Sequence, residues 1–235
     1  MKKLFPALCM LLVAAALLGT STYAWFSMNE TVEATGMSVS AVADDPYLII
    51  AAGTTLEGSA IKADVQRDVV LDPVTPAVEL TADNIETATS WKIAVGESAT
   101  DGSAKEGDYT TLADNTKLFE AETGHNAYLL KQSFVVGRLA SAAEVTNNLK
   151  MTLDMHDSPG LTVVVICDDF MESYAADVTT AVEIATAAEV NAEDGVQIDV
   201  YIYIDGDNTG VTSANVEALE GSSVALTFSV DVTEE

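Results

Sequence analysis

The chain carries the sequence VQIDVYIYID at Val196–Asp205. Apolar residues occupy every second position and so point to one face, whereas Gln197 and Asp199 share the other face with two tyrosines. A spacing of two is that of a β-strand with one face against a core. This stretch therefore predicts that the protein is built from β-sheet.

The same alternation recurs on both sides of this stretch. Leu149–Met155 and Ser222–Val232 alternate as cleanly, and Leu161–Cys167 (LTVVVIC) is apolar at nearly every position. The apolar run predicts a central strand that is buried on both faces. Further strands are expected at Gly36–Val42, Tyr47–Ala52, Val69–Leu71, Ala77–Leu80, Ser90–Val95, Ala127–Gly137 and Ala181–Ala187.

Helices are expected to contribute little. Ser141–Glu144 has the spacing of a capping box, and Ser213–Leu219 is long enough for two turns. Residues 60–125 are rich in loops and are the region most expected to carry surface insertions. Short strands separated by turns predict an all-β protein, an antiparallel β-sandwich or jelly roll with one or two short helices.

The first 24 residues have the pattern of an export signal. Two lysines precede the apolar run Leu4–Leu18, and the small residues Thr22 and Ala24 fit a peptidase site. Cleavage is expected between Ala24 and Trp25. The run is shorter than the roughly 20 residues that span a bilayer, so an uncleaved membrane anchor is the alternative. The expected organisation is a signal helix at 1–24, an N-terminal arm at 25–35 and one β-sandwich domain at 36–235, secreted or on the cell surface.

The chain is strongly acidic. Its net charge is −27; without Lys2 and Lys3, 8 of the 10 basic residues remain against 37 acidic ones, which gives −29. Such a charge repels nucleic acid and anionic lipid. Cys167 is the one cysteine beyond the signal, so no internal disulfide forms, as in exported proteins of Gram-positive or anaerobic bacteria. We expect Cys167 to be a buried thiol.

One turn has the spacing of a calcium loop. Asp205, Asp207 and Thr209 stand at alternate positions before a glycine. The glutamate that a complete loop needs at its twelfth position is absent, because Val216 stands there. A plain polar turn is the alternative, and calcium is the only cofactor that the sequence suggests.

The sequence has no common catalytic motif, although a Ser/His/Asp arrangement between distant residues is left as an alternative. The two histidines, His125 and His156, lie in turn-like stretches, and neither an H-E-x-x-H nor a G-x-S-x-G pattern occurs. Asp168 and Asp169 follow a strand, where they either bind a ligand or simply face solvent. We expect no enzyme.

The segment Trp25–Thr35 is a candidate for assembly. A β-sandwich exposes unpaired backbone groups at its sheet edges, and an extended segment from a neighbour can pair with them. The segment carries the apolar residues Trp25, Phe26, Met28 and Val32. We expect it to be donated to a groove beside the terminal strands of a neighbouring copy; the alternative is a strand of its own domain.

Both ends of the chain resemble one family. GTSTYAWFS at Gly19–Ser27, ATGMSVSA at Ala34–Ala41 and GSSVALTFSV at Gly221–Val230 are similar to the first and last segments of the TasA/camelysin family. The resemblance implies export through a SipW-type signal peptidase and a jelly-roll subunit of biofilm-matrix fibres that assemble by N-terminal strand donation. Some members are described as metal-dependent proteases, but this sequence has no recognisable cluster of metal ligands.

Overall fold

The structure, a computed structural model of the whole chain, describes residues 37–43, 48–57, 60–67, 71–94, 109–119, 127–142, 144–156, 158, 160–208, 211 and 222–230. All of them belong to one compact unit, Glu33–Glu235. Residues 1–36 lie outside the described residues. They contain the predicted signal peptide, its cleavage site between Ala24 and Trp25, and the arm at 25–35. All of these except the last three residues of the arm belong to a separate unit, Met1–Val32. None of the described helices is long and apolar enough to cross a membrane.

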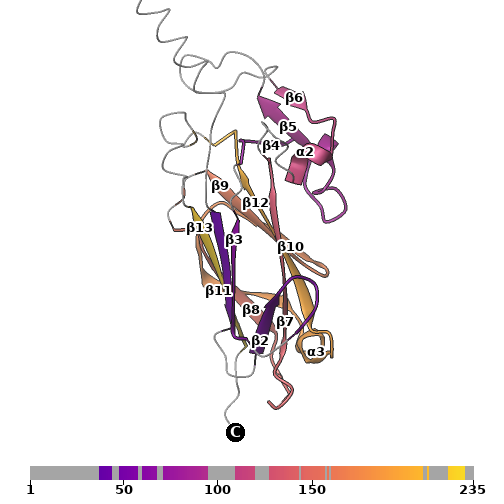
Figure 1. Cartoon of the computed structure of the whole chain (residues 1–235), viewed down its shortest axis with the longest axis vertical. Helices are drawn as coiled ribbons and strands as arrows, with labels where there is room; N and C mark the ends of the chain where they lie inside the picture. The colour runs from indigo at the N-terminus through magenta and orange to yellow at the C-terminus, as the bar shows by residue number, and fades with distance from the viewer. Residues whose placement is uncertain are drawn as a thin grey trace, which may run out of the picture. The chain divides into compact units, whose positions relative to one another are not determined.

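Two five-stranded sheets form the body of the described part (Figure 1). Sheet A has the strand order β11-β8-β13-β1-β3, and sheet B has the order β10-β9-β12-β7-β2. The strands of sheet A are β1 (Met37–Ala43), β3 (Lys62–Arg67), β8 (Leu149–Asp154), β11 (Val178–Ala185) and β13 (Ser223–Val230). Those of sheet B are β2 (Leu48–Ala52), β7 (Leu130–Arg138), β9 (Leu161–Cys167), β10 (Phe170–Tyr174) and β12 (Val196–Ile204).

The chain changes sheet at almost every connection. Among the strands of these two sheets the exception is the β9–β10 hairpin, closed by the pair Cys167 and Phe170; between β3 and β7 the chain also forms a small third sheet. All strand pairs in the two sheets are antiparallel except β1 with β13. The predicted all-β sandwich is therefore confirmed.

The two terminal strands lie inside sheet A. β1 pairs with β13 on one side and with β3 on the other, and β13 also pairs with β8. The expectation of an open groove beside these strands is wrong, because β3 fills that place. The edges of the sheets are β11 and β3 in sheet A, and β10 and β2 in sheet B.

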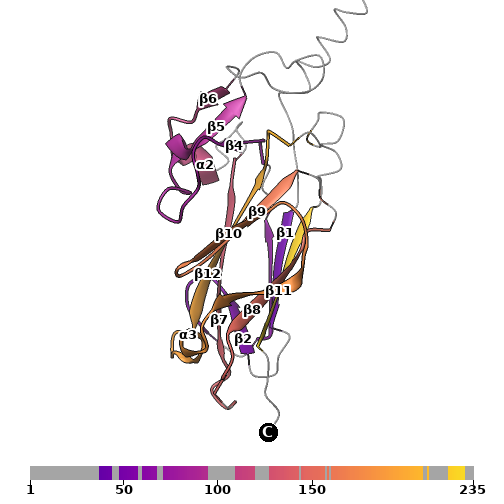
Figure 2. The same cartoon turned by 180° about the vertical axis from the view of Figure 1, so that it is seen from behind.

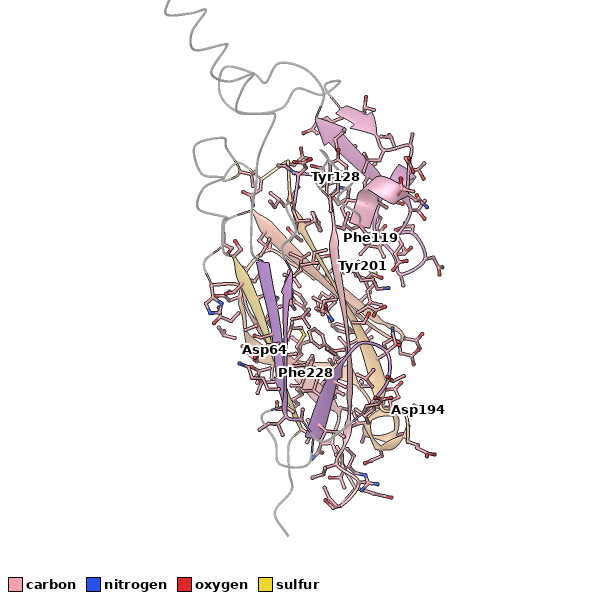
Figure 3. All side chains as sticks on the ribbon, in the orientation of Figure 1. Asp64, Phe119, Tyr128, Asp194, Tyr201 and Phe228 are labelled. Carbon is pink, nitrogen blue, oxygen red and sulfur yellow. The ribbon has the colours of Figure 1, made fainter. Side chains whose placement is uncertain are left out.

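The core between the sheets follows the predicted alternation. In β13 the even-numbered residues from Val224 to Val230 are buried, while the residues between them are half-buried. Phe228 is fully buried and lies between the sheets in Figure 3. Burying an aliphatic or aromatic side chain contributes about 1.5–3 kcal/mol, so these rows stabilise the sandwich.

A third layer, which we call the cap, covers part of the outer face of sheet B. It consists of the described residues of 71–129, and its chain enters and leaves at one place, where Leu71 pairs with Ala127. Figures 1 and 2 show its elements gathered near the end of β12. They are β4 (Thr75–Pro76), η1 (Ala88–Ser90), β5 (Trp91–Ala94), β6 (Tyr109–Thr111) and α2 (Thr116–Phe119).

The cap explains why β9 is apolar at nearly every position. Its second face packs into a separate apolar cluster of cap and sheet B, so it is buried on both faces as predicted. The cluster contains Val74, Ile85, Ala88, Trp91, Leu112, Leu118, Leu129, Val164, Tyr201 and Tyr203.

Some local predictions are wrong. Ala77–Leu80 forms no strand, because the Asn84 side chain bonds to the Thr81 N–H and to the Glu79 carbonyl and holds a turn there. No helix forms in the described part of Ser141–Glu144. The capping box is found instead at α3 (Ala187–Asn191), between Thr186 and Glu189. The predicted helix Ser213–Leu219 lies outside the described residues.

Candidate functional site

The most connected polar cluster lies where the cap meets sheet B. Its centre is Lys131 of β7, whose Nζ is 2.6 Å from Glu86 Oε1 and 3.2 Å from Asp199 Oδ2. Glu86 belongs to the cap and Asp199 to β12. We call Glu86, Lys131, Asp199 and Tyr201 the polar junction, because it joins the two layers.

Tyr201 completes the polar junction. Its hydroxyl donates to Glu86 Oε1 at 2.6 Å, and the ammonium of Lys131 lies 5.2 Å from the centre of its ring. The antiparallel register of β7 and β12 places Lys131 and Tyr201 directly opposite each other. On the cap side, the centre of the Phe119 ring lies 6.4 Å from the centre of the Tyr201 ring, and Figure 3 labels the two residues next to each other.

The contacts within the polar junction favour the charged forms of Glu86, Asp199 and Lys131. The hydrogen bond from Lys131 lowers the pKa of Glu86. Burial acts to raise the pKa of Asp199, but hydrogen bonds from Ser133 and Gln197 outweigh it and the pKa is lowered. Burial also acts to lower the pKa of Lys131, yet its contacts with Glu86, Tyr201 and Asp199 together outweigh this and the pKa rises. An ammonium held protonated cannot act as a base or nucleophile, so this arrangement suits a structural contact.

The predicted calcium residues also contact the cap. Asp205 pairs with Val74 in a short bridge, and its carboxylate accepts from the Asp207 N–H at 3.1 Å. The Asp207 carboxylate accepts from the Tyr109 hydroxyl and lies 3.8 Å from Lys92 Nζ. A lysine therefore stands beside the carboxylate that was expected to bind calcium.

The third expected ligand, Thr209, lies outside the described residues. Within the described ranges no group of three or more His, Cys, Asp or Glu side chains is placed to hold a metal ion. Residues 205–208 form a turn, with the Asn208 N–H donating to the Asp205 carbonyl at 3.1 Å. Calcium binding at this turn therefore stays a prediction.

The Asp168–Asp169 pair forms the turn of the β9–β10 hairpin. Asp168 has a positive φ of 49° and lines an open cleft of about 380 Å³ together with Glu189 and Asp199. A hydrogen bond with Glu189 raises the pKa of Asp168. Glu189 in turn accepts from the Thr186 N–H at 2.6 Å as part of the capping box. The cleft thus brings carboxylates together, and each has a partner in the chain.

Cys167 and His156 are the remaining candidate groups in the part of the chain that the structure describes. Cys167 is 1 % exposed, and burial raises the pKa of its thiol to about 12, so it is a buried thiol as expected. His156 lies in an exposed turn with its Nδ1 3.3 Å from Asp154 Oδ1. His125 lies outside the described residues, as do the arm residues Trp25, Phe26, Met28 and Val32.

Comparison of the chain with known protein families, with curated proteins and with solved structures returns no match. The resemblance of the two chain ends to the TasA/camelysin family therefore stays a prediction.

Sequence reasoning missed the polar junction. Glu86 and Tyr201 are 115 positions apart, and no local motif links them. The sequence gives one indication of this contact. On the outward face of β12, Tyr201 and Tyr203 alternate with the core residues, and two large aromatic side chains on that face indicate that another layer of the protein covers them.

Proposed function

We propose that this chain is an exported, non-enzymatic subunit of an extracellular fibre, built by donation of the segment Trp25–Thr35 to a sheet edge of a neighbouring copy. The proposal includes cleavage after Ala24, SipW-type processing, membership of the TasA/camelysin family and a place in the biofilm matrix or on the surface of a Gram-positive cell. The partners are other copies of the chain and matrix or cell-surface proteins.

The observation that carries the proposal is the place of β1. This strand begins at Met37, two positions after the end of the arm at Thr35, and both of its sides are occupied, by β13 and β3. The arm therefore has no place beside the strand that it precedes. Its eleven residues span at most about 36–40 Å when extended, enough to reach along the edge of another sandwich.

The sheet edges are not equally open to a donated strand. Among the described strands, β3 carries the ion pair Lys62–Asp64, and β11 has two irregularities in its register with β8. Charged residues and bulges discourage edge pairing. In β2 the Ile50 N–H already donates to the Ala60 carbonyl at 2.8 Å. This leaves β10 as the edge that we favour. Its register with β9 has no irregularity, and its one charged residue, Glu172, accepts a hydrogen bond from the Tyr174 hydroxyl at 2.8 Å.

The two other functions considered have less support. A monomeric adhesin or calcium-binding module would use Asp205 and Asp207, but Lys92 lies beside Asp207. A camelysin-like metalloprotease requires a metal site, for which the described residues provide no cluster.

Two matched double variants of the protein that starts at Trp25 test strand donation. Met28→Asp with Val32→Asp charges one face of the arm, and Ser27→Asp with Thr31→Asp adds the same charges at the same spacing on the other face. We expect fibres, seen by negative-stain electron microscopy, to be lost only with the first pair. Fibres from a protein that lacks Trp25–Thr35 altogether would contradict the proposal.

A further inference from the structure

The cap is attached to the sandwich as a separate layer. Its two ends lie together, since Leu71 pairs with Ala127 and the Asp72 N–H donates to the Ala127 carbonyl at 2.9 Å. Its apolar cluster is distinct from the core between the sheets. A layer of this kind can loosen without breaking the strand pairs of the two sheets, because sub-global opening follows such units.

Two ion pairs link the cap to the sandwich in the described residues, and both depend on a carboxylate. Glu86 of the cap meets Lys131 of β7 at 2.6 Å, and Lys92 of the cap lies 3.8 Å from Asp207, just after β12. The core between the sheets and the cluster under the cap are both apolar, so their burial energy does not depend on the protonation of these groups. Acid therefore removes only the charged part of the cap's attachment, and the sandwich has its strand pairing as well.

We propose that the cap is an acid-releasable layer: protonation of Glu86 and Asp199 breaks the polar junction and loosens the cap from sheet B while the sandwich stays folded. The groups that face Glu86 are Lys131, Tyr201 and, at longer range, Asp199. Those that face Asp199 are Ser133, Gln197 and Lys131, and the carboxyl groups of Asp168 and Glu189 line the same cleft. This inference concerns the stability of the described domain and does not depend on fibre formation.

The direction of the pH effect follows from the charges. The pKa values of Glu86 and Asp199 are lowered in the folded protein. Their contribution to stability is therefore complete above the ordinary carboxyl pKa values of 4.5 and 3.8, and it is lost as the pH falls through the lowered pKa values. Because the pKa of Lys131 is raised, its contribution to stability is complete below pH 10.5, its ordinary pKa, and is lost only in strong alkali.

Trp91 reports directly on the cap. It is fully buried, and its Nε1 donates to the Ile85 carbonyl at 2.8 Å. In a Trp25→Phe background, Trp91 is the single tryptophan of the chain. We expect its emission to shift to the red and its quenching by acrylamide to rise several-fold between pH 7 and pH 2.5, while far-UV circular dichroism keeps the β-sheet signal.

Two further variants separate the polar junction from general acid effects. Glu86→Gln keeps the shape and removes the charge, so we expect stronger quenching at pH 7 and a smaller further change in acid. Lys62→Gln removes the exposed pair with Asp64 on β3 and should titrate like the parent. The proposal is overturned if Trp91 stays protected at pH 2.5, if its exposure coincides with loss of the sheet signal, or if Glu86→Gln titrates like the parent.

Discussion

The indole ring of Trp91 meets the phenol ring of Tyr203 edge to face, with ring centres 4.9 Å apart and planes at 71°. Trp91 belongs to the cap and Tyr203 to the outer face of sheet B, and both are buried. Such pairs contribute about 0.5–1.5 kcal/mol beyond the area that they bury. This contact is therefore a main apolar attachment between the two layers.

Replacement of Trp91 by alanine should lower the free energy of unfolding by about 3–5 kcal/mol, because it removes a fully buried aromatic ring and its partner contact. Urea denaturation followed by far-UV circular dichroism measures the loss. Val78→Ala is the control in the same layer, since Val78 is 51 % exposed, and it should change the value by less than about 0.5 kcal/mol. Equal effects of the two changes would show that the cap is not packed as described.

Lys131 and Glu86 should be energetically coupled. We expect Lys131→Met to cost about 1–2 kcal/mol at pH 7, because it leaves Glu86 and Asp199 without their shared cation. The double variant with Glu86→Gln should cost less than the sum of the single changes. Lys62→Met, which removes an exposed pair, is the control and should cost under about 1 kcal/mol. If the effects of Lys131→Met and Glu86→Gln on the free energy of unfolding simply add, the contact between Lys131 and Glu86 contributes nothing to stability.

Two glycines with positive φ allow a matched test of close packing. Gly195 has φ +66°, and a Cβ there would lie 2.7 Å from the Val136 carbonyl oxygen; Gly53 has φ +102° with nothing within 4 Å. We expect Gly53→Ala to cost about 1 kcal/mol from backbone strain and Gly195→Ala about 3 kcal/mol, because the backbone must also shift. Thermal unfolding compares the two. A smaller loss for Gly195→Ala would contradict the approach of this turn to β7.

Cys167 should be unreactive in the folded protein, because it is buried and the pKa of its thiol is raised to about 12. Iodoacetamide at pH 8 should leave the peptide that contains Cys167 unmodified in buffer and should modify it fully in urea, as measured by mass spectrometry. Modification in buffer at the rate of a free thiol would place Cys167 at the surface.

Strands with a strong local pattern were predictable from the sequence. β8, β12 and β13 alternate apolar and polar residues, and β9 is apolar at nearly every position, so each was expected within a few residues of its observed bounds. β10 was not expected, because Phe170–Tyr174 has no clear alternation and its hairpin turn of two aspartates resembles the end of a strand.

The sequence was sufficient for the fold class because the period of apolar residues is a local property, set by the geometry of the extended backbone. The order of the strands, the place of β3 beside β1 and the cap over Tyr201 and Tyr203 were decided by the tertiary structure. The polar junction belongs to this second group, because its charges come from segments far apart in the chain. No local pattern encodes the contact between Glu86, Lys131 and Asp199; packing of the cap on sheet B creates it.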